Sequence, residues 1–248
     1  MTISYITIND VPAKLFKAEN AHGTVLAIHG FGGSKESGAI TGLAERVCPM
    51  GFNVLTFDLP AHGERLGGAE QLDPMCCIEE IIAAEKYIRD ELTEDIYAFA
   101  TSFGGMCMLH RIEKLPHAFR KIVLRVPAVN MGYSLFAIAK GCDPSLTPEK
   151  AKKDGFRIVL GREYLAPYSF YESIKELHCL RPSHAWNNSN IMVIWAENDE
   201  LVRPSDTLEF LKHNTEVHSI CISGSGHRMT APQHLAEALD TAATFLQN

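Results

Sequence analysis

The chain has 248 residues, 46% of them hydrophobic, and a formal net charge of −7. This length and composition suffice for one α/β domain with a sizeable core. The acidic balance, with no run of Lys and Arg longer than Lys152-Lys153, argues against a nucleic-acid partner, because binding a phosphate backbone requires clustered cations.

The first residues, Met-Thr-Ile-Ser-Tyr-Ile-Thr-Ile, lack the charged and long apolar regions of a secretory signal, and no apolar stretch is long enough to span a bilayer. We therefore expect a soluble, cytoplasmic protein with no membrane partner. The seven cysteines are an odd number and include no C-x-x-C pair, which favours reduced thiols over a disulfide framework or a zinc site.

The predicted elements alternate between strands and helices. Residues 2–18 alternate between apolar and polar, as the strands of an antiparallel hairpin do. Nearly unbroken apolar runs follow, and these are typical of parallel strands that are covered on both faces. Amphipathic stretches such as 77–90 lie between the runs. This order predicts an α/β fold, a doubly wound and mostly parallel sheet with antiparallel edge strands. The apolar runs are 24–30, 53–59, 95–100, 121–129, 190–196 and 217–223.

The segment 131–188 interrupts this alternation, because it is too long for one crossover helix and contains several glycines and prolines. We predict that it is an inserted lid, partly helical, with a short hairpin around 156–160 and 163–165. The whole chain, 1–248, is otherwise expected to form a single domain.

Three residues at the ends of predicted strands suggest a catalytic triad. Ligands of open parallel sheets bind at the carboxyl ends of the strands, and Ser102, Asp199 and His227 each follow such a run. Serine is a weak nucleophile unless a base takes its proton and a third group orients that base. The order Ser, Asp, His is that of the α/β-hydrolase triad. We predict Ser102 as nucleophile, Asp199 as acid and His227 as base.

The surroundings of the serine fit a sharp turn from strand to helix. Such a turn admits only small side chains two residues before and after the serine, and the usual G-x-S-x-G is here Ala100-Thr-Ser-Phe-Gly104. Phe103 would open the helix with its backbone N–H directed at an oxyanion. The glycine-rich loop 29–33 would supply the backbone N–H of Phe31 as the second donor.

Each triad residue has a plainer interpretation on its own. Ser102 could be a helix N-cap, Asp199 could lie in a solvated turn with Glu197 or Glu200 as the acid, and His227 is one of eleven histidines. The hypothesis depends on their combination, with three suitable residue types at three strand ends in one order.

Two further histidines follow predicted strands. We expect His29 to shape the oxyanion loop through hydrogen bonds and His62 to be structural. A metal site formed by His29, His62 and Asp58 is the alternative, but no H-x-x-x-H spacing on a helix supports it.

Several blocks of the sequence resemble those of the serine α/β-hydrolases: His-Gly-Phe-Gly-Gly, Asp-Leu-Pro-Ala-His-Gly-Glu, Ser-Phe-Gly-Gly, Glu-Asn-Asp-Glu-Leu-Val and Ser-Gly-His. The resemblance covers essentially the whole chain and is greatest to small bacterial carboxylesterases of the cinnamoyl or feruloyl esterase type. It implies the α/β-hydrolase fold, with helices on both faces of the sheet and a small inserted lid. It also implies Ser102, Asp199 and His227 as the triad, Phe31 and Phe103 as oxyanion donors, and no cofactor.

The resemblance further implies a serine carboxylesterase that forms an acyl-enzyme on small soluble esters, aromatic hydroxycinnamoyl esters among them. Thioesterase, monoacylglycerol lipase and serine aminopeptidase-like activities stay open, because all use the same intermediate. A non-catalytic ligand-binding protein is the second alternative. An apolar lid also leaves a homodimer open. The lid side chains that would line an acyl pocket, or merely pack the lid, are Phe136, Ile138, Phe156, Ile158, Tyr164, Tyr168 and Phe170.

Overall fold

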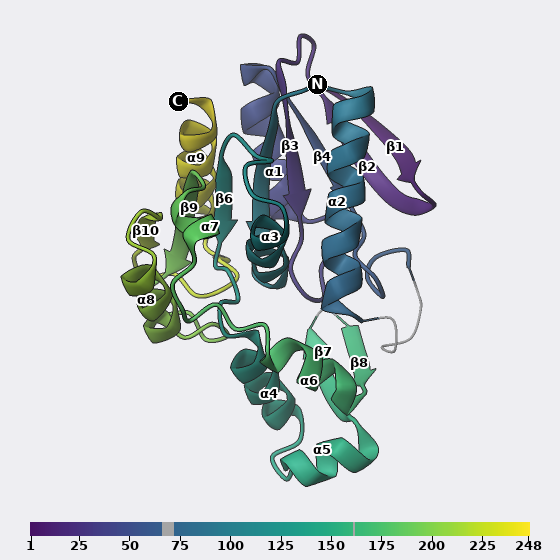
Figure 1. Ribbon diagram of the computed structural model, residues 1–248, viewed down its shortest axis with the longest axis vertical. Coiled ribbons are helices and arrows are strands. Elements are labelled where there is room, and N and C mark those ends of the chain that lie inside the picture. Colours follow the sequence, from purple (N-terminus) through teal and green to yellow (C-terminus); the bar gives the residue numbers. More distant parts are fainter. Residues whose placement is uncertain (66–71, 161) are drawn as a thin grey trace.

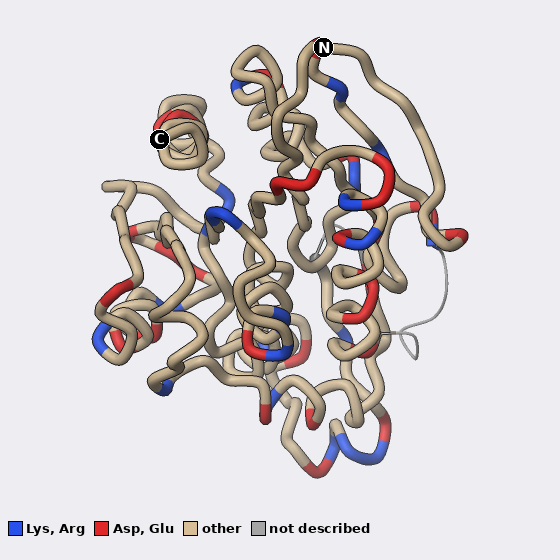
Figure 2. Tube along the Cα trace, turned by 45° about the horizontal axis from the view of Figure 1, so that its top comes forward, with Lys and Arg blue, Asp and Glu red and all other residues tan. Residues whose placement is uncertain are grey.

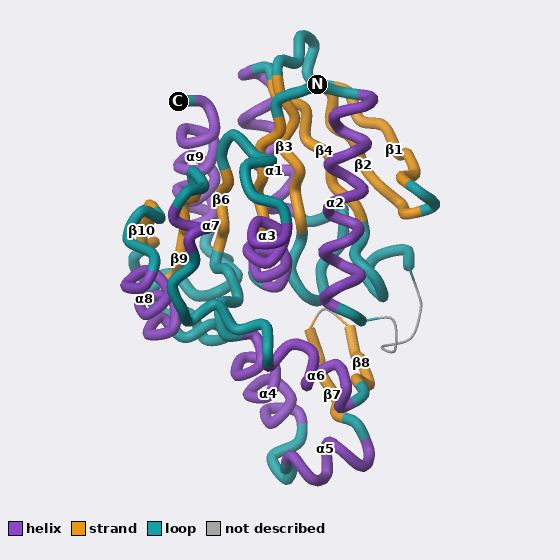
Figure 3. Tube along the Cα trace, in the orientation of Figure 1, coloured by secondary structure: helices purple, strands orange, loops and turns teal. Residues whose placement is uncertain are grey.

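The computed structural model describes residues 1–65, 72–160 and 162–248. A central sheet has helices on both faces (Figures 1 and 3), which confirms the predicted α/β class. Within the described residues the sheet has eight strands in the order β1-β2-β4-β3-β5-β6-β9-β10. They are β1 (Thr2–Ile8), β2 (Val11–Lys17), β3 (Gly23–Ile28), β4 (Phe52–Phe57), β5 (Ile96–Thr101), β6 (Ile122–Arg125), β9 (Ile191–Ala196) and β10 (His218–Ile222).

The sheet is antiparallel at one edge only. Strand β1 pairs with β2, and β2 with β4, in antiparallel register, whereas all the remaining neighbours are parallel. Asn9 and Asp10 connect the hairpin with φ values of 49° and 66°, as a tight two-residue turn requires. The predicted edge hairpin and the mostly parallel sheet are therefore both confirmed.

The helices cover the two faces of the sheet with separate sets of buried side chains. Helices α1 and α9 pack on one face, and α2 and α3 on the other. All six residues of β3 and of β4 are buried, because both faces of these strands are covered. The helices of this layer structure are α1 (Gly38–Val47), α2 (Pro74–Glu91), α3 (Phe103–Lys114), α8 (Pro204–His213) and α9 (Pro232–Gln247), with a 3-10 turn at Cys48–Met50.

Most of the residues between β6 and β9 form a layer beyond the carboxyl ends of the parallel strands, whereas their last helix, α7, packs against α3 (Figure 1). Their hairpin, β7 with β8, is antiparallel, as predicted. Buried residues of the segment between β6 and β9, Met131, Ile158 and Trp186 among them, join the core on the α2–α3 face. The elements are α4 (Met131–Cys142), α5 (Pro148–Asp154), β7 (Phe156–Leu160), β8 (Arg162–Ala166), α6 (Tyr168–Lys175) and α7 (His184–Asn187).

One predicted strand is too long. The apolar run 121–129 suggested a strand throughout, but β6 ends at Arg125, because Val126 has φ 44° and Pro127 cannot donate to the ladder. Residues 126–129 instead lead away from the sheet toward α4.

Figure 2 shows the basic and acidic positions interspersed over most elements.

Candidate active site

Ser102 is the only residue between β5 and α3, and its backbone is strained. Its φ of 52° and ψ of −115° lie in a region that residues other than glycine rarely adopt. Three backbone hydrogen bonds hold it there: its N–H donates to Arg125 at 3.0 Å, and its carbonyl accepts from Met106 at 3.1 Å and from Ala128 at 3.0 Å. Neighbouring structure thus fixes the hydroxyl above the end of β5.

The close packing of α3 on the sheet explains the small residues around the serine. A Cβ atom at Gly104 would lie 2.5 Å from the carbonyl oxygen of His29, which is backbone and cannot give way. Ala100 is completely buried, so the methyl group that replaces the usual glycine hydrogen is accommodated in the core. The unusual first position of the motif is therefore compatible with the turn.

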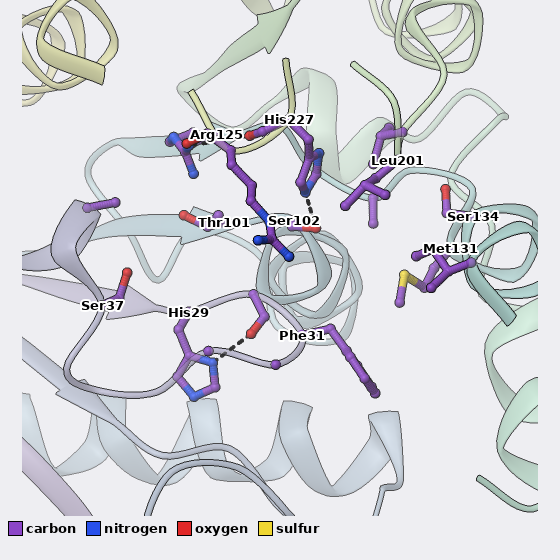
Figure 4. A pocket seen from close by; sticks show the side chains of 18 of the residues that line it. His29, Phe31, Ser37, Thr101, Ser102, Arg125, Met131, Ser134, Leu201 and His227 are labelled. Carbon is purple, nitrogen blue, oxygen red and sulfur yellow. Dashed lines mark hydrogen bonds between the residues drawn. The ribbon is translucent and has the colours of Figure 1, made fainter. Parts of the chain in front are cut away.

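His227 contacts Ser102 through one ring nitrogen (Figure 4) and Asp199 through the other. Its Nε2 is 3.0 Å from Ser102 Oγ, and its Nδ1 is 2.8 Å from Asp199 Oδ2 and 3.0 Å from Oδ1. The imidazole is largely buried on the loop after β10. The structure thus places the three predicted triad residues, far apart in the chain, in one hydrogen-bonded row.

The other two acids of the Asp199 loop have different contacts. Glu197 accepts from the N–H of Gly224 at 2.7 Å, and Glu200 accepts from the backbone N–H of His227 at 2.9 Å. Asp199 alone of the three contacts the imidazole, and its Oδ1 also accepts from the N–H groups of Leu201 and Val202. Glu197 and Glu200 hold the loop that bears His227.

The two predicted oxyanion donors flank Ser102. Phe103 follows it as the first residue of α3, and Phe31 belongs to the loop after β3. That loop lies against the serine, since a Cβ atom built at Gly30 would be 3.1 Å from Ser102 Cβ. The rings of Phe31 and Phe103 pack edge to face with centroids 5.7 Å apart.

His29 joins the loop after β3 to the loop after β4. Its Nε2 accepts from the N–H of Leu59 at 3.1 Å, so Nδ1 carries the proton that is donated to the Gly30 carbonyl at 2.8 Å. Burial lowers the pKa of His29, which fits this neutral form.

The alternative metal site finds no support among the described residues, which hold no group of three or more His, Cys, Asp and Glu suited to a metal ion. Buried Asp58 instead accepts from Lys35 Nζ at 3.0 Å and from the N–H groups of Lys35 and Glu64. The ring of His62 packs beside that of His29. These residues therefore support the loops that follow β3 and β4.

Ser102 and His227 lie in the wall of a pocket of about 410 Å³. Of the seven lid side chains considered from the sequence, only Ile138 lines it; Phe156, Ile158, Tyr164 and Phe170 are buried in the core instead. The other lining residues are His29, Gly30, Phe31, Gly32, Gly33, Ser37, Gly38, Ala39, Thr101, Arg125, Ala128, Met131, Ser134, Leu201, Val202, Arg228 and Leu235.

Arg125 is a pocket residue that the sequence interpretation missed. It ends β6, is 5% exposed, and donates through one guanidinium nitrogen to the carbonyls of Arg228 at 3.1 Å and His227 at 3.4 Å. Burial lowers the pKa of Arg125 to about 10, although the negative charge of Asp199 acts to raise it. The available signal was a lone arginine inside an otherwise apolar run.

Comparison with known proteins identifies the family. The model of the α/β-hydrolase fold family matches residues 23–164, more than half of the chain. The chain therefore belongs to this family, and the resemblance seen in the sequence is confirmed. A comparison with curated proteins gives no significant match.

Solved structures of similar fold cover almost all of the chain. Est1E from Butyrivibrio proteoclasticus is 18% identical with a TM-score of 0.74, over 98% of this chain and 97% of that one. A putative hydrolase from Agrobacterium vitis is 16% identical with a TM-score of 0.76, over 99% and 98%. An esterase from Pyrococcus furiosus is 19% identical with a TM-score of 0.71, over 99% and 89%.

Membership of the α/β-hydrolase family supports a hydrolase activity. Within the described residues, none of the helices has the length and hydropathy needed to cross a membrane.

Proposed function

We propose that the protein is a serine carboxylesterase that hydrolyses small esters through an acyl-enzyme on Ser102. The observation that carries this proposal is the row of hydrogen bonds from Ser102 Oγ through the His227 imidazole to Asp199. Such a row occurs where a hydroxyl is to be deprotonated by a base whose tautomer is fixed by an acid. The strained backbone of Ser102 and the adjoining pocket further support a nucleophile.

In the first half-reaction Ser102 Oγ attacks the ester carbonyl carbon, and His227 Nε2 takes the hydroxyl proton. Asp199 accepts the Nδ1–H of His227 and offsets the charge of the imidazolium. The tetrahedral intermediate then collapses, the bond to the leaving oxygen breaks, and His227 returns the proton to the alcohol. Water repeats the sequence on the acyl-enzyme and releases the acid and Ser102.

The developing oxyanion requires donors that are already in place. The backbone N–H groups of Phe31 and Phe103 are proposed for this role, since both residues adjoin Ser102 and Phe103 lies at the positive end of α3. Each such donor is worth about 3–4 kcal/mol in a reference protease. The bonds of His29 and the packing of Phe31 would keep the first donor in position.

The pocket favours an apolar group on one side of Ser102. Met131 and Leu201 lie there (Figure 4), and Ile138 and Val202 are further apolar lining residues of the pocket. The structure of Est1E contains ferulic acid, an aromatic acid, and we include hydroxycinnamoyl esters among the candidate substrates on this ground. Thioesters and monoacylglycerols would pass through the same acyl-enzyme, so only measured rates separate them.

A fluorophosphonate probe and a panel of p-nitrophenyl esters of graded length, with hydroxycinnamate esters beside them, test the proposal. We expect the wild type to be labelled and to turn over several of the esters. The Ser102→Ala variant should lose labelling and several orders of magnitude in kcat/KM, because the nucleophile is gone. A folded wild type that neither reacts with the probe nor hydrolyses any ester would favour the non-catalytic alternative.

A further inference from the structure

We propose that the preferred esters carry a carboxylate, which binds on the side of the pocket formed by Arg125, Arg228 and the first turn of α1. This inference deepens the proposed function and rests on it. We call this side of the pocket, with Ser37, Gly38 and Thr101, the cationic side.

The charge of the pocket wall is opposite to that of the whole chain. Acidic residues outnumber basic ones by 30 to 23 in the sequence. Among the described residues that line the pocket, however, there are two arginines and no aspartate or glutamate. The nearest acid of the site, Asp199, is already engaged by His227 and by two backbone N–H groups. An anionic substrate would therefore meet two arginines in the pocket wall, while Asp199, which also attracts Arg125, lies outside the lining residues.

Arg125 has a donor to spare. Its Nη2 is used by the carbonyls of His227 and Arg228, but its buried Nε has no partner among the described residues. A buried guanidinium N–H left unpaired is costly, and a carboxylate oxygen would satisfy it. With a pKa of about 10, lowered by burial, the side chain stays protonated at neutral pH.

Two neutral features of the same side also favour an anion. The hydroxyl of Thr101 lacks a hydrogen-bond partner within the described segments of the chain. Helix α1 begins at Gly38 with no side-chain cap from Ser37 and no acidic residue in its first turn. The backbone N–H groups and the dipole at such a helix start attract negative charge.

Arg125 and the largest apolar side chains of the pocket lie on opposite sides of the nucleophile. In Figure 4, Ser37, Thr101 and Arg125 lie on one side of Ser102, and Met131, Leu201 and Ser134 lie on the other. An ester bound with its carbonyl at Ser102 would therefore extend its apolar group toward Met131 and Leu201 and its charged group toward Arg125.

A substrate with one negative charge would neutralise the positive charge that remains on the cationic side. Asp199 already attracts Arg125 electrostatically, so the exposed Arg228 contributes the remaining positive charge. A planar carboxylate also suits the fork of donors that a guanidinium presents.

Two pairs of esters test the proposal, each with a carboxylate and a neutral amide of similar size. In 4-acetoxybenzoate and 4-acetoxybenzamide the group is on the leaving alcohol, and in the mono-4-nitrophenyl ester of adipic acid and its adipamide counterpart it is on the acyl chain. We expect the carboxylate of one pair to have a kcat/KM about tenfold higher, as a charge-assisted hydrogen bond would give. The pair in which the carboxylate reacts faster than the amide identifies whether the leaving alcohol or the acyl chain faces Arg125.

Variants of Arg228 separate the local charge from the charge of the whole protein. Arg228→Gln should lower the carboxylate-to-amide ratio of that pair toward one, and Arg228→Glu should bring it below one. Arg120→Gln is the matched control: it removes an exposed arginine just before β6, at the far end of the strand from Arg125, and should leave the ratio unchanged. Salt at 1 M should lower the wild-type ratio through screening.

The outcomes distinguish this inference from the function on which it rests. If both members of each pair are hydrolysed at equal rates, or the amides are preferred, the carboxylate proposal is overturned while the esterase proposal stands. If no ester is hydrolysed and the fluorophosphonate fails to label Ser102, both are overturned.

Discussion

At the level of single residues, the site depends on which side chain contacts which atom of His227. Three acids lie within four positions, and all three bond to the loops of the site, but through different partners. Asp199 bonds to the imidazole, whereas Glu200 bonds to the backbone of the same histidine. Their substitutions should therefore have different effects.

Asp199→Asn is expected to lower kcat by about four orders of magnitude, because an amide nitrogen at this position would favour the wrong imidazole tautomer. Glu200→Gln should lower it far less, since an amide oxygen can still accept from the His227 N–H. Steady-state kinetics with a p-nitrophenyl ester would measure both. Full activity in Asp199→Asn, with a loss in Glu200→Gln, would move the acid to Glu200.

Gly104 offers a test of the close contact between α3 and the loop after β3. In Gly104→Ala the new methyl group would meet the His29 carbonyl, so either the helix or the loop must move. We expect a loss of about 1–3 kcal/mol in the free energy of unfolding, typical of overpacking, together with slower fluorophosphonate labelling.

Gly141→Ala is the matched control, because a Cβ atom built at this helical position meets nothing within 4 Å. It should raise the free energy of unfolding by about 0.5–1 kcal/mol through helix propensity and leave labelling unchanged. Urea titrations of the two variants would give the comparison. Equal stability for both would show that α3 and the loop tolerate a methyl group between them.

At the level of elements, α3 carries the serine at its start and is anchored at its end. Glu113 in its last turns makes a two-bond ion pair with Arg181, at 2.8 and 2.7 Å, and accepts from the Ser183 hydroxyl at 2.8 Å. Burial alone would raise the pKa of Glu113, but these bonds and that of His110 outweigh it and lower the pKa to about 2. The end of the helix is thus joined to the chain that precedes α7.

The lowered pKa predicts a pH dependence of stability. A carboxyl group whose pKa is depressed on folding stabilises the fold above its unfolded value of 4.5, and this contribution is lost as the pH falls toward about 2. Glu113→Gln should therefore lower the urea midpoint at pH 7 and flatten the decline in stability between pH 4.5 and 2. Glu79→Gln, which breaks an exposed pair with Lys114, should change stability by less than about 1 kcal/mol. Identical pH profiles for wild type and Glu113→Gln would contradict the assignment.

At the level of the whole molecule, the layer between β6 and β9 shares one core with the α2–α3 face. Side chains such as Ile158 are fully buried in that cluster, so we propose that the chain, with its inserted lid, unfolds as one unit. Native-state hydrogen exchange should then give the amides of β7 and β8 the same free energy of opening as those of β5. Exposed edge strand β1 should open more readily. A much lower value for β7 and β8 alone would make the insertion a separate unit.

The features that could be predicted from the sequence are those with a local pattern. Unbroken apolar runs indicated the parallel strands, and polar residues just after them indicated Ser102, Asp199 and His227. Arg125 was missed because the apolar run around it hid the end of β6. The sequence left open whether the lid aromatics line the pocket or pack the lid, because apolar character predicts burial but not the neighbour against which a side chain packs; Phe156 and Phe170 lie in the core.

The ring of Phe31 packs against Tyr164 of β8 and Phe170 of α6, with centroids 5.0 and 6.0 Å away. The backbone N–H of Phe31 is also a proposed donor to the oxyanion. The packing of the Phe31 ring therefore affects both the size of the pocket that it lines and the rate of the reaction. Substitutions that repack Tyr164 or Phe170 would shift Phe31, which lines the pocket, and its amide together, and we expect a paired change in kcat and KM. Widening the range of substrates that the protein accepts would then require compensating substitutions in the loop 29–33.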